Sequence, residues 1–439
     1  MKFYDRKREL QMFSNIYDRS SDEAQMTVLI GRRRIGKTEL ALRCGGDTPL
    51  LYFFVARKSE PMLCRDFIDE TEHKLNVPVG EHVTFASLFR QLMFLSRSMR
   101  FTVVIDEFQD WLRINPSVFS EIQREWDLGK AGSRMNLIIS GSVYSMMKKI
   151  FEDSKEPLFS RANQMIRLKA FDTDVQKEIL GDYNPHYNNR DLLTLYTMTH
   201  GVAWYVGLLM NNGCFTSERM LSMLTEEDSP FINEGKNLLI EEFGADYARY
   251  FSILSCIADG EVTRAQIENI TGIKEIGGYI ERLKTHYNII DSHTPIFSKP
   301  KTKSVRYVIS DNFLTVWFRF FYKYQRFIEC GALAQLSRVV DRDMPVLEGF
   351  MLERYFRQRL MESQRYTSVG QFWDRKGEHE IDIVAVNEID GIADVYEVKR
   401  NLDKYDEQLL REKVDYMLSV CPEMKGMKIN VGCLSVDDM

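Results

Sequence analysis

The chain has 439 residues, 44% of them hydrophobic, and a formal net charge of -6 at pH 7. This length exceeds what one hydrophobic core supports, so we expect several globular domains. The sequence has no run of about 18 uncharged apolar residues and no signal-peptide stretch, which predicts a cytoplasmic protein without a membrane segment. Its seven scattered cysteines include no Cys-x-x-Cys pair, which argues against a zinc site or a redox disulfide.

Short apolar runs alternate with longer amphipathic segments between Met26 and Asp172. The runs span residues 27–30, 50–55, 101–105, 137–139 and 165–168. This alternation predicts a parallel sheet covered by helices on both faces. From residue 173 to 244 strand signals vanish and helical spacing dominates, which predicts a helical lid.

A different order of elements begins at residue 245. Two helices, at 266–271 and 274–286, precede extended segments at 289–290 and 306–309, which is the order of a winged helix. An aromatic helix is expected at 313–327, and we interpret its rings as core or interface packing in preference to nucleic-acid stacking.

The last part of the chain returns to mixed character and predicts a separate α/β domain. Its expected elements are helices at 345–361 and 405–420 and strands within 371–386, at 392–399 and at 428–434.

A complete phosphate-binding pattern runs from Gly31 to Thr38, between an apolar strand and a helix. Glycines let backbone N–H groups converge on phosphate oxygens, and the helix N-terminus adds its dipole. Lys37 is expected to reach the β and γ phosphates of ATP, and Thr38 to bind Mg²⁺. The predicted nucleotide-binding residues of this segment are Gly31, Arg34, Ile35, Gly36, Lys37, Thr38 and Glu39.

Two carboxylates, Asp106 and Glu107, end the apolar strand 101–105. Asp106 is expected to hold the magnesium ion through water, and Glu107 to polarise the water that attacks the γ-phosphoryl group. Such a pair can also be a solvated turn, but the phosphate loop upstream favours the catalytic interpretation.

Two further positions are candidates at the same site. Ser140 follows the strand 137–139, where a hydroxyl could sense the γ-phosphate or simply cap a turn. Arg161 could act as an arginine finger, within one chain or across an oligomer interface, or be an ordinary surface arginine.

These motifs resemble those of the archaeal-type ATPases, in the STAND branch of the AAA+-like NTPases. The similar residues cover roughly the first half of the chain: 3–10, the phosphate loop with its arginines, 106–109, 140–142 and 157–161. The resemblance implies an ATPase in which the segment containing Arg6 lies against the adenine.

Near the C-terminus, Asp382 on one predicted strand precedes Glu397 and Lys399 on the next. Residues two apart on a strand share a face, so Glu397 and Lys399 project together. With Asp382 they could hold one or two Mg²⁺ ions at a scissile phosphate, while Lys399 orients or activates the water. Glu353 on the preceding helix could complete the acidic set, with Glu348 as the second candidate.

Acids at this spacing also occur in surface hairpins, but apolar neighbours predict buried strands, where charges are costly unless paired or metal-bound. The pattern, together with 349–353, Trp373 and 380–382, resembles the restriction-endonuclease-like PD-(D/E)xK fold found at the C-terminus of archaeal-type ATPases. The resemblance leaves two functions open: an active nuclease, or an inactive domain that keeps the shape.

The hairpin of the predicted winged helix is basic. Lys299, Lys301, Lys303 and Arg306 lie within residues 299–306, with no acid among them. Such a wing could lie along a DNA backbone despite the acidic net charge. A solvated hairpin tip and a hinge that holds the nucleotide domain shut are the alternatives.

We therefore predict an α/β protein with four domains. These are a P-loop ATPase core (1–172), a helical lid (173–244), a winged helix with the aromatic helix (245–330) and a restriction-endonuclease-like domain (331–439). The predicted function is a Mg²⁺- and ATP-dependent enzyme that acts on DNA, alone or as a homo-oligomer. The alternatives are a DNA-binding ATPase without cleavage and a signalling switch whose inactive C-terminal domain binds a protein partner.

Overall fold

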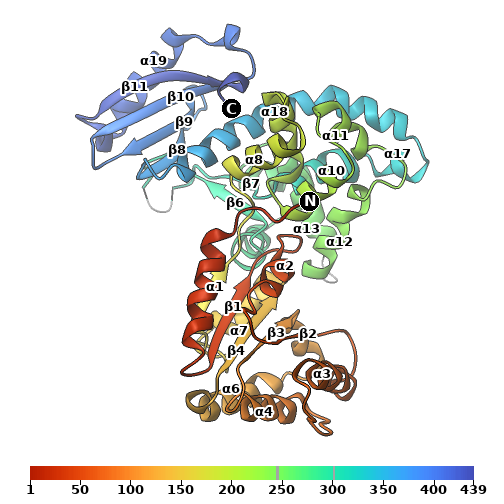
Figure 1. Cartoon of the computed structure of the whole chain (residues 1–439). Coiled ribbons are helices and arrows are strands. Elements are labelled where there is room, and N and C mark those ends of the chain that lie inside the picture. Colours follow the sequence, from red (N-terminus) through yellow and green to blue (C-terminus); the bar gives the residue numbers. More distant parts are fainter. Residues whose placement is uncertain (244–246, 300–301) are drawn as a thin grey trace. The chain divides into compact units, whose positions relative to one another are not determined.

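The structure is a computed structural model that describes residues 1–243, 247–299 and 302–439 (Figure 1). Its residues form two compact units, Tyr4–Lys169 and Met1–Phe3 with Ala170–Met439. Lys301 of the predicted basic wing and the predicted boundary between residues 244 and 245 lie outside the described residues. The finer division into four domains stays a prediction.

Five parallel strands form the sheet of the unit Tyr4–Lys169, in the order β2-β3-β4-β1-β5. The strands are β1 (Gln25–Ile30), β2 (Leu50–Phe54), β3 (Phe101–Asp106), β4 (Met135–Gly141) and β5 (Gln164–Arg167). Every residue of β1, β3 and β4 is buried, as expected for parallel strands covered on both faces. The predicted parallel sheet is thus confirmed.

Helices flank this sheet (Figure 1). They are α1 (Lys7–Arg19), α2 (Lys37–Leu42), α3 (Glu60–Leu75), α4 (Phe85–Leu95), η1 (Phe108–Asp110), α5 (Trp111–Ile114), α6 (Val118–Gly129), η2 (Lys130–Gly132) and α7 (Tyr144–Glu152). Local chemistry sets their ends. The Thr84 side chain, for example, caps α4 by accepting a hydrogen bond from the Ser87 N–H.

Helices alone fill residues 173–243. They are α8 (Thr173–Tyr183), α9 (Asn189–Thr199), α10 (Ala203–Asn211), α11 (Ser217–Leu224) and α12 (Phe231–Phe243). Asn188 and Asp191 form a reciprocal capping box at the start of α9.

A helix, helix, hairpin order follows, as the sequence predicts for a winged helix. The elements are α13 (Tyr247–Ala258), α14 (Arg264–Thr271), α15 (Gly277–Glu281), η4 (Arg282–His286), β6 (Ile290–His293), β7 (Arg306–Ile309), α16 (Asn312–Val316), η5 (Trp317–Tyr322) and α17 (Gln325–Glu329). The expected aromatic helix is divided among α16, η5 and α17. Trp317 and Phe318 are buried and contact the ring of Phe251, so these aromatic residues pack in a core.

The C-terminal sheet has four strands in the order β11-β10-β9-β8. The elements are α18 (Leu333–Glu362), β8 (Ser368–Trp373), β9 (Glu380–Asn387), β10 (Ile392–Lys399), η6 (Leu402–Lys404), α19 (Glu407–Val420), η7 (Pro422–Met424), β11 (Lys428–Ser435) and η8 (Val436–Asp438). Strand β9 is antiparallel to β8 and β10, whereas β11 is parallel to β10.

The start of α18 differs from the prediction. The sequence predicts a helix that begins at Pro345, but α18 begins at Leu333 and contains Pro345 in its interior. An interior proline costs about 3 kcal/mol because it removes one backbone hydrogen bond. Burial of Leu336, Val340 and Met344 along the helix offsets that cost.

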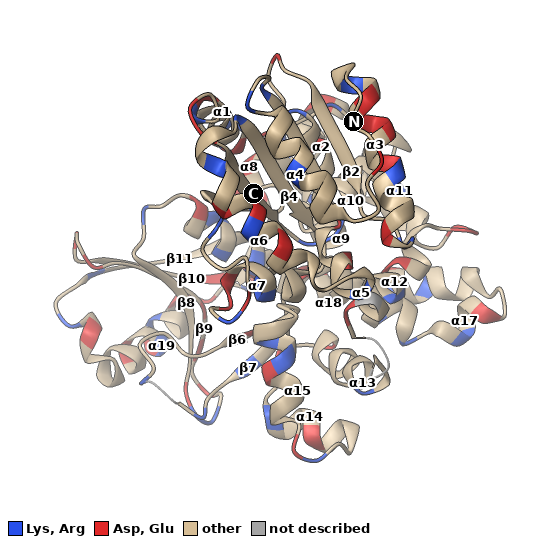
Figure 2. Cartoon of the chain, turned by 90° about the horizontal axis from the view of Figure 1, so that it is seen from below, with Lys and Arg blue, Asp and Glu red and all other residues tan. Residues whose placement is uncertain are grey.

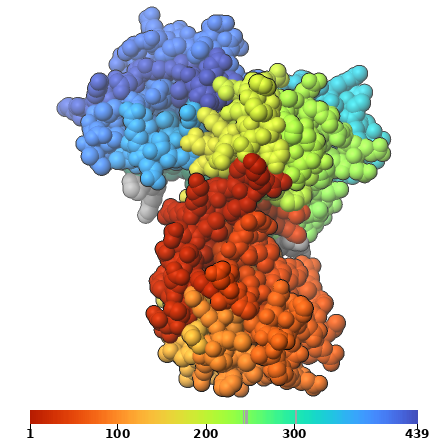
Figure 3. Space-filling view, viewed as in Figure 1, coloured from red at the N-terminus to blue at the C-terminus, as the bar shows by residue number. Residues whose placement is uncertain are grey.

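Two long-range contacts tie the C-terminal sheet to earlier parts of its unit. The Ile296 N–H, in the β6–β7 connection, donates to the Gln371 carbonyl at 2.7 Å, and the Ile296 side chain joins the core of the C-terminal sheet. At the chain end, Lys177 Nζ donates to a Met439 oxygen at 2.8 Å. Accordingly, the blue C-terminal residues lie against the yellow helical residues in Figure 3.

Candidate functional site

The predicted phosphate loop lies between β1 and α2. Gly36 has φ 95° and Arg34 has φ 72°, both in the left-handed region. A Cβ added at Gly31 would lie 3.1 Å from the Leu168 carbonyl oxygen, so the chain is close-packed there. Ile35 is buried and fixes the loop to the core.

Lys37 points into this loop. Its side chain is 6% exposed, and its Nζ donates to the carbonyl oxygens of Gly31 at 2.8 Å and Arg32 at 3.0 Å. Burial lowers the pKa of Lys37 to about 8, although Glu107 and Asp106 act in the opposite direction. A phosphate group in the loop would favour the charged ammonium.

Thr38 and Asp106 meet at the carboxyl end of the strands. Thr38 Oγ1 donates to Asp106 Oδ2 at 2.7 Å, and the Tyr52 hydroxyl donates to the same oxygen at 2.9 Å. A hydroxyl and a carboxylate are oxygen ligands of the kind Mg²⁺ prefers, so these residues fit the predicted ion. Tyr52 carries no signal in the sequence, because one tyrosine in an apolar strand has no distinguishing pattern.

Glu107 is held by two neighbours. Its Oε2 accepts hydrogen bonds from Ser142 Oγ at 2.6 Å and from Gln109 Nε2 at 2.5 Å. Ser140, by contrast, is fully buried in β4, and its Oγ has no hydrogen-bond partner within the described part of the chain. The structure therefore brings Ser142 to Glu107, whereas the role predicted for Ser140 stays a prediction.

Arg6 and Glu39 were predicted to contact the nucleotide. Arg6 is buried, and its Nη1 lies 3.8 Å from Asp5 and 3.9 Å from Glu9. Glu39, in the first turn of α2, forms an exposed ion pair with Arg43 at 2.6 Å. Neither contact tests the predicted role of Arg6 or Glu39.

Arg161 lies near the amino ends of the parallel strands, opposite to the end that carries the phosphate loop. Its guanidinium pairs with Asp127, in the last turn of α6, at 3.2 Å. Nearby, the Asn163 N–H donates to the carbonyl of Met26, at the amino end of β1. The phosphate loop follows the carboxyl end of β1, about 17 Å away along the strand. This position does not support an arginine finger within one chain, and a finger across an oligomer interface stays a prediction.

Asp382, Glu397 and Lys399 come together on one face of the C-terminal sheet. The antiparallel register of β9 and β10 brings the strand segments of Asp382 and Glu397 side by side. Lys399 Nζ donates to Glu397 Oε2 at 2.6 Å and lies 3.8 Å from Asp382 Oδ2. Burial, followed by the charge of Glu397, raises the pKa of Asp382.

A second lysine, Lys413 of α19, reaches the same cluster. Its Nζ donates to Glu397 Oε1 at 2.6 Å. Burial alone would raise the pKa of Glu397, but the hydrogen bonds from Lys399 and Lys413 outweigh it and the pKa is lowered. Lys413 was not predicted, because a lysine on an amphipathic helix carries no motif signal.

Glu353 of α18 lies beside this cluster. Its Oε2 is 3.9 Å from the Arg357 guanidinium, and burial together with the charge of Asp382 raises its pKa. Glu348, the second candidate, is buried elsewhere in an ion pair with Arg400 at 3.2 Å. The structure thus brings Glu353 to the cluster and not Glu348.

Arg306 of the predicted basic wing is bound to the C-terminal sheet. Its guanidinium contacts both carboxylate oxygens of Glu380, at 2.5 and 3.2 Å, and lies 4.4 Å from the centre of the Trp373 ring. The expectation that Arg306 faces a DNA backbone therefore does not hold in this arrangement. Lys299 and Lys303 are exposed.

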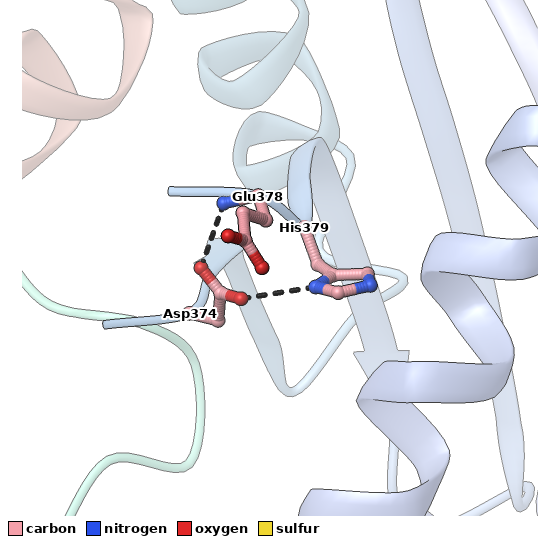
Figure 4. Close-up of side chains that lie close together, drawn as sticks. All are labelled: Asp374, Glu378 and His379. Atoms are coloured by element: carbon pink, nitrogen blue, oxygen red, sulfur yellow. Dashed lines mark hydrogen bonds and ion pairs between the residues drawn. The ribbon is translucent and has the colours of Figure 1, made fainter. Parts of the chain in front are cut away.

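A polar cluster at the β8–β9 turn consists of Asp374, Glu378 and His379 (Figure 4). Asp374 Oδ2 lies 2.9 Å from His379 Nδ1, and Asp374 Oδ1 accepts from the Glu378 N–H at 2.9 Å. The His379 ring stacks on Tyr416. These contacts close the hairpin turn and need no metal ion to account for them.

Charged residues of both signs lie on the same helices. Basic and acidic residues occur together on α14 and α17 (Figure 2). No helix among the described residues combines the length and apolar character needed to cross a membrane.

Comparisons with known proteins match one family to the C-terminal half of the chain and one relative to most of the chain. Residues 317–409 match the family DUF234, described as archaea bacterial proteins of unknown function. The uncharacterized protein MJECL04 of Methanocaldococcus jannaschii is 26% identical over 406 residues, which cover 90% of this chain and 87% of that protein.

Two solved structures also match. The Walker-type ATPase PABY2304 of Pyrococcus abyssi has a TM-score of 0.53 and 19% identity, over 72% of this chain and 96% of that one. The ORC2 protein of Aeropyrum pernix, in ADPNP–ADP complexes, has a TM-score of 0.49 and 14% identity, over 70% of this chain and 90% of the ORC2 chain.

The Pyrococcus similarity, at this low identity, concerns the fold and not the activity. It agrees with the parallel sheet and its flanking helices. The chain thus has a P-loop NTPase fold, with an additional mixed-sheet domain near its C-terminus.

Proposed function

We propose that the unit Tyr4–Lys169 binds Mg-ATP and hydrolyses its γ-phosphate. The observation that carries this proposal is the 2.7 Å contact between Thr38 Oγ1 and Asp106 Oδ2, next to a lysine buried in the phosphate loop. The similarity to a protein named a Walker-type ATPase supports it.

Each residue has a distinct role in this proposal. Thr38 and Asp106 hold the magnesium ion, which neutralises charge on the phosphates when bound. Lys37 exchanges its two carbonyl contacts for β and γ phosphate oxygens. Glu107, fixed through Oε2, uses Oε1 to orient the attacking water and accept its proton.

Replacing the phosphate-loop lysine tests this proposal. Lys37→Ala should abolish measurable ATP hydrolysis and weaken ATP binding by at least about tenfold, since it removes a charge from the phosphates. Lys149→Ala is a matched control, because Lys149 forms only an exposed ion pair with Glu156. Wild-type turnover in Lys37→Ala would rule the site out.

We further propose that the C-terminal domain cleaves DNA with a divalent cation. The supporting observation is the convergence of Asp382, Glu397, Lys399 and Glu353 from two strands and a helix. The order of elements, a helix, three antiparallel strands, a helix and a strand parallel to the third, agrees with the resemblance stated above.

In this proposal the ATPase controls the nuclease. Asp382 and Glu397 bind the cation, Lys399 orients the water, and Glu353 completes the acidic set. Exposed Lys299 and Lys303 contact the DNA backbone, and Arg161 serves a neighbouring subunit if the chain assembles as a homo-oligomer. ATP hydrolysis then acts as a switch or a motor stroke.

Release of nicked or cut DNA tests this second activity. Purified protein is incubated with Mg²⁺ or Mn²⁺ and single-stranded, duplex or branched DNA, with and without ATP. Cleavage lost in Asp382→Ala but ATP hydrolysis retained would support the nuclease, and the response of cleavage to Lys37→Ala would show whether ATP controls it. Intact cleavage in Asp382→Ala would contradict the assignment.

The alternative is a signalling switch with an inactive C-terminal domain that binds a protein partner. The hydrogen bonds that Lys399 and Lys413 donate to Glu397 favour this alternative, because they compensate the negative charge of the carboxylate without any metal ion. This alternative predicts slow ATP hydrolysis, partner binding or self-association with ATP, and no cleavage of any DNA.

A further inference from the structure

Each carboxylate of the polar cluster in the C-terminal sheet already has a cationic side chain beside it. Three carboxylates face three cations at 2.6 to 3.9 Å: Asp382, Glu397 and Glu353 with Lys399, Lys413 and Arg357. A divalent cation added to this set would leave excess positive charge in a half-buried site. One of the resident cations is therefore expected to move off the carboxylates when a metal ion binds.

Lys399 is placed to be that cation. Its ammonium lies between the two strand carboxylates, 2.6 Å from Glu397 Oε2 and 3.8 Å from Asp382 Oδ2. A metal ion that bridges both carboxylates would need the same position. The Lys399 side chain is 32% exposed, so its ammonium has room to move off the two carboxylates and still lie beside the site.

Lys413 holds Glu397 from the other side. Its Nζ contacts Glu397 Oε1 at 2.6 Å, and its side chain is only 18% exposed. The helix that carries it is anchored, since Leu410, Val414 and Met417 of α19 lie in the core of the C-terminal sheet. Lys413 is therefore the less mobile of the two lysines.

We propose that Lys413 takes the place of a second metal ion, so that this site accepts a single divalent cation. The ion replaces the Lys399 ammonium between Asp382 and Glu397, while Lys413 keeps Glu397 Oε1. Two-metal sites place their ions about 3.5–4 Å apart, and a lysine on this oxygen occupies the side from which a second ion would approach. The inference rests on the proposed metal-dependent function of this domain.

Mn²⁺ binding to the full chain without nucleotide tests the proposal. The number of Mn²⁺ ions lost in Asp382→Asn, measured by electron paramagnetic resonance and calorimetry, counts the ions of this site. We expect one ion in the wild type. Lys399→Gln should keep one ion and bind it on the order of tenfold more tightly, because a competing charge is gone.

Substitutions on α19 then isolate Lys413. Lys413→Gln should admit a second ion, whereas Lys413→Arg should keep one. Arg411→Gln is the matched control, because Arg411 pairs with Glu407 on the exposed face of the same helix. Thermal unfolding of each variant reports whether the domain stays folded.

The outcomes separate this inference from the function beneath it. Two ions in the wild type or in Lys413→Arg, or one ion in a folded Lys413→Gln, would overturn the role of Lys413 and leave the metal site standing. No Mn²⁺ binding that depends on Asp382 would overturn the metal site and this inference together.

Discussion

Glu107→Gln separates ATP binding from ATP hydrolysis. The amide has the size of the carboxylate, and its oxygen can still accept the hydrogen bonds from Ser142 and Gln109. The Thr38–Asp106 contact and the burial of Lys37 do not involve the Glu107 side chain. The substitution should therefore remove the base and leave the phosphate site intact.

The magnitude follows from the role of a general base. Such a group contributes about 10²–10⁴-fold to the rate, which corresponds to about 3–5 kcal/mol of activation free energy. We expect ATP turnover to fall by that factor, whereas the Kd for ATP changes by less than about threefold because the phosphate ligands remain.

Phosphate release under steady-state conditions measures turnover, and fluorescence of a labelled ATP analogue measures affinity. Glu152→Gln is the control, because Glu152 belongs to the same unit and pairs with Arg167 at 2.6 Å. Turnover in Glu107→Gln above about a tenth of the wild-type rate would refute the assignment of Glu107 as the base.

Three further tests use Lys37, Glu353 and Arg306. Burial lowers the pKa of Lys37 from 10.5 to about 8, so the unfolded chain binds more protons between these values. Below pH 8 the wild type should therefore be less stable than Lys37→Met. This difference in the free energy of unfolding should decrease by up to about 3 kcal/mol as the pH rises from 8 to 10.5. Chemical denaturation of both proteins measures it, and a constant difference would contradict the reasoning. Burial raises the pKa of Glu353 above its ordinary value of 4.5, so its carboxylate destabilises the fold increasingly above that pH. Glu353→Gln should gain thermal stability over the wild type toward pH 8, and no such gain would mean that Glu353 is better solvated. Arg306→Ala should cost on the order of 1 kcal/mol of stability, because its partly exposed ion pair with Glu380 is lost. In filter binding, the DNA affinity of Arg306→Ala should stay within about twofold of the wild-type value, whereas Lys303→Ala should bind DNA more weakly. Equal losses of affinity in the two variants would mean that Arg306 contacts DNA.

Local patterns predicted most elements and the nucleotide loop. Buried parallel strands are continuous apolar runs, so the limits predicted for β1, β2 and β3 lie within two residues of the observed limits. The phosphate loop concentrates its groups in one short segment, and its geometry follows from glycine and helix-terminus chemistry. The position of Glu397 and Lys399 on one face of β10 is equally predictable from the sequence, because alternate residues of a strand share a face.

Contacts between distant segments needed the tertiary structure. Ser142 at Glu107, Tyr52 at Asp106 and Lys413 at Glu397 join residues from neighbouring strands or from a helix and a strand. No local pattern marks these residues, because their role depends on strand order and helix packing.

The phosphate loop, the acidic strand ends and the alternation of elements follow from residues close together in the chain, since these features depend on backbone conformation and burial over a few residues. Long-range packing, in contrast, pairs Arg161 with Asp127, away from the phosphate loop, and Arg306 with Glu380. A charged side chain finds its partner among whatever residues the fold brings near it, and for both arginines that partner is more than 30 positions away in the chain.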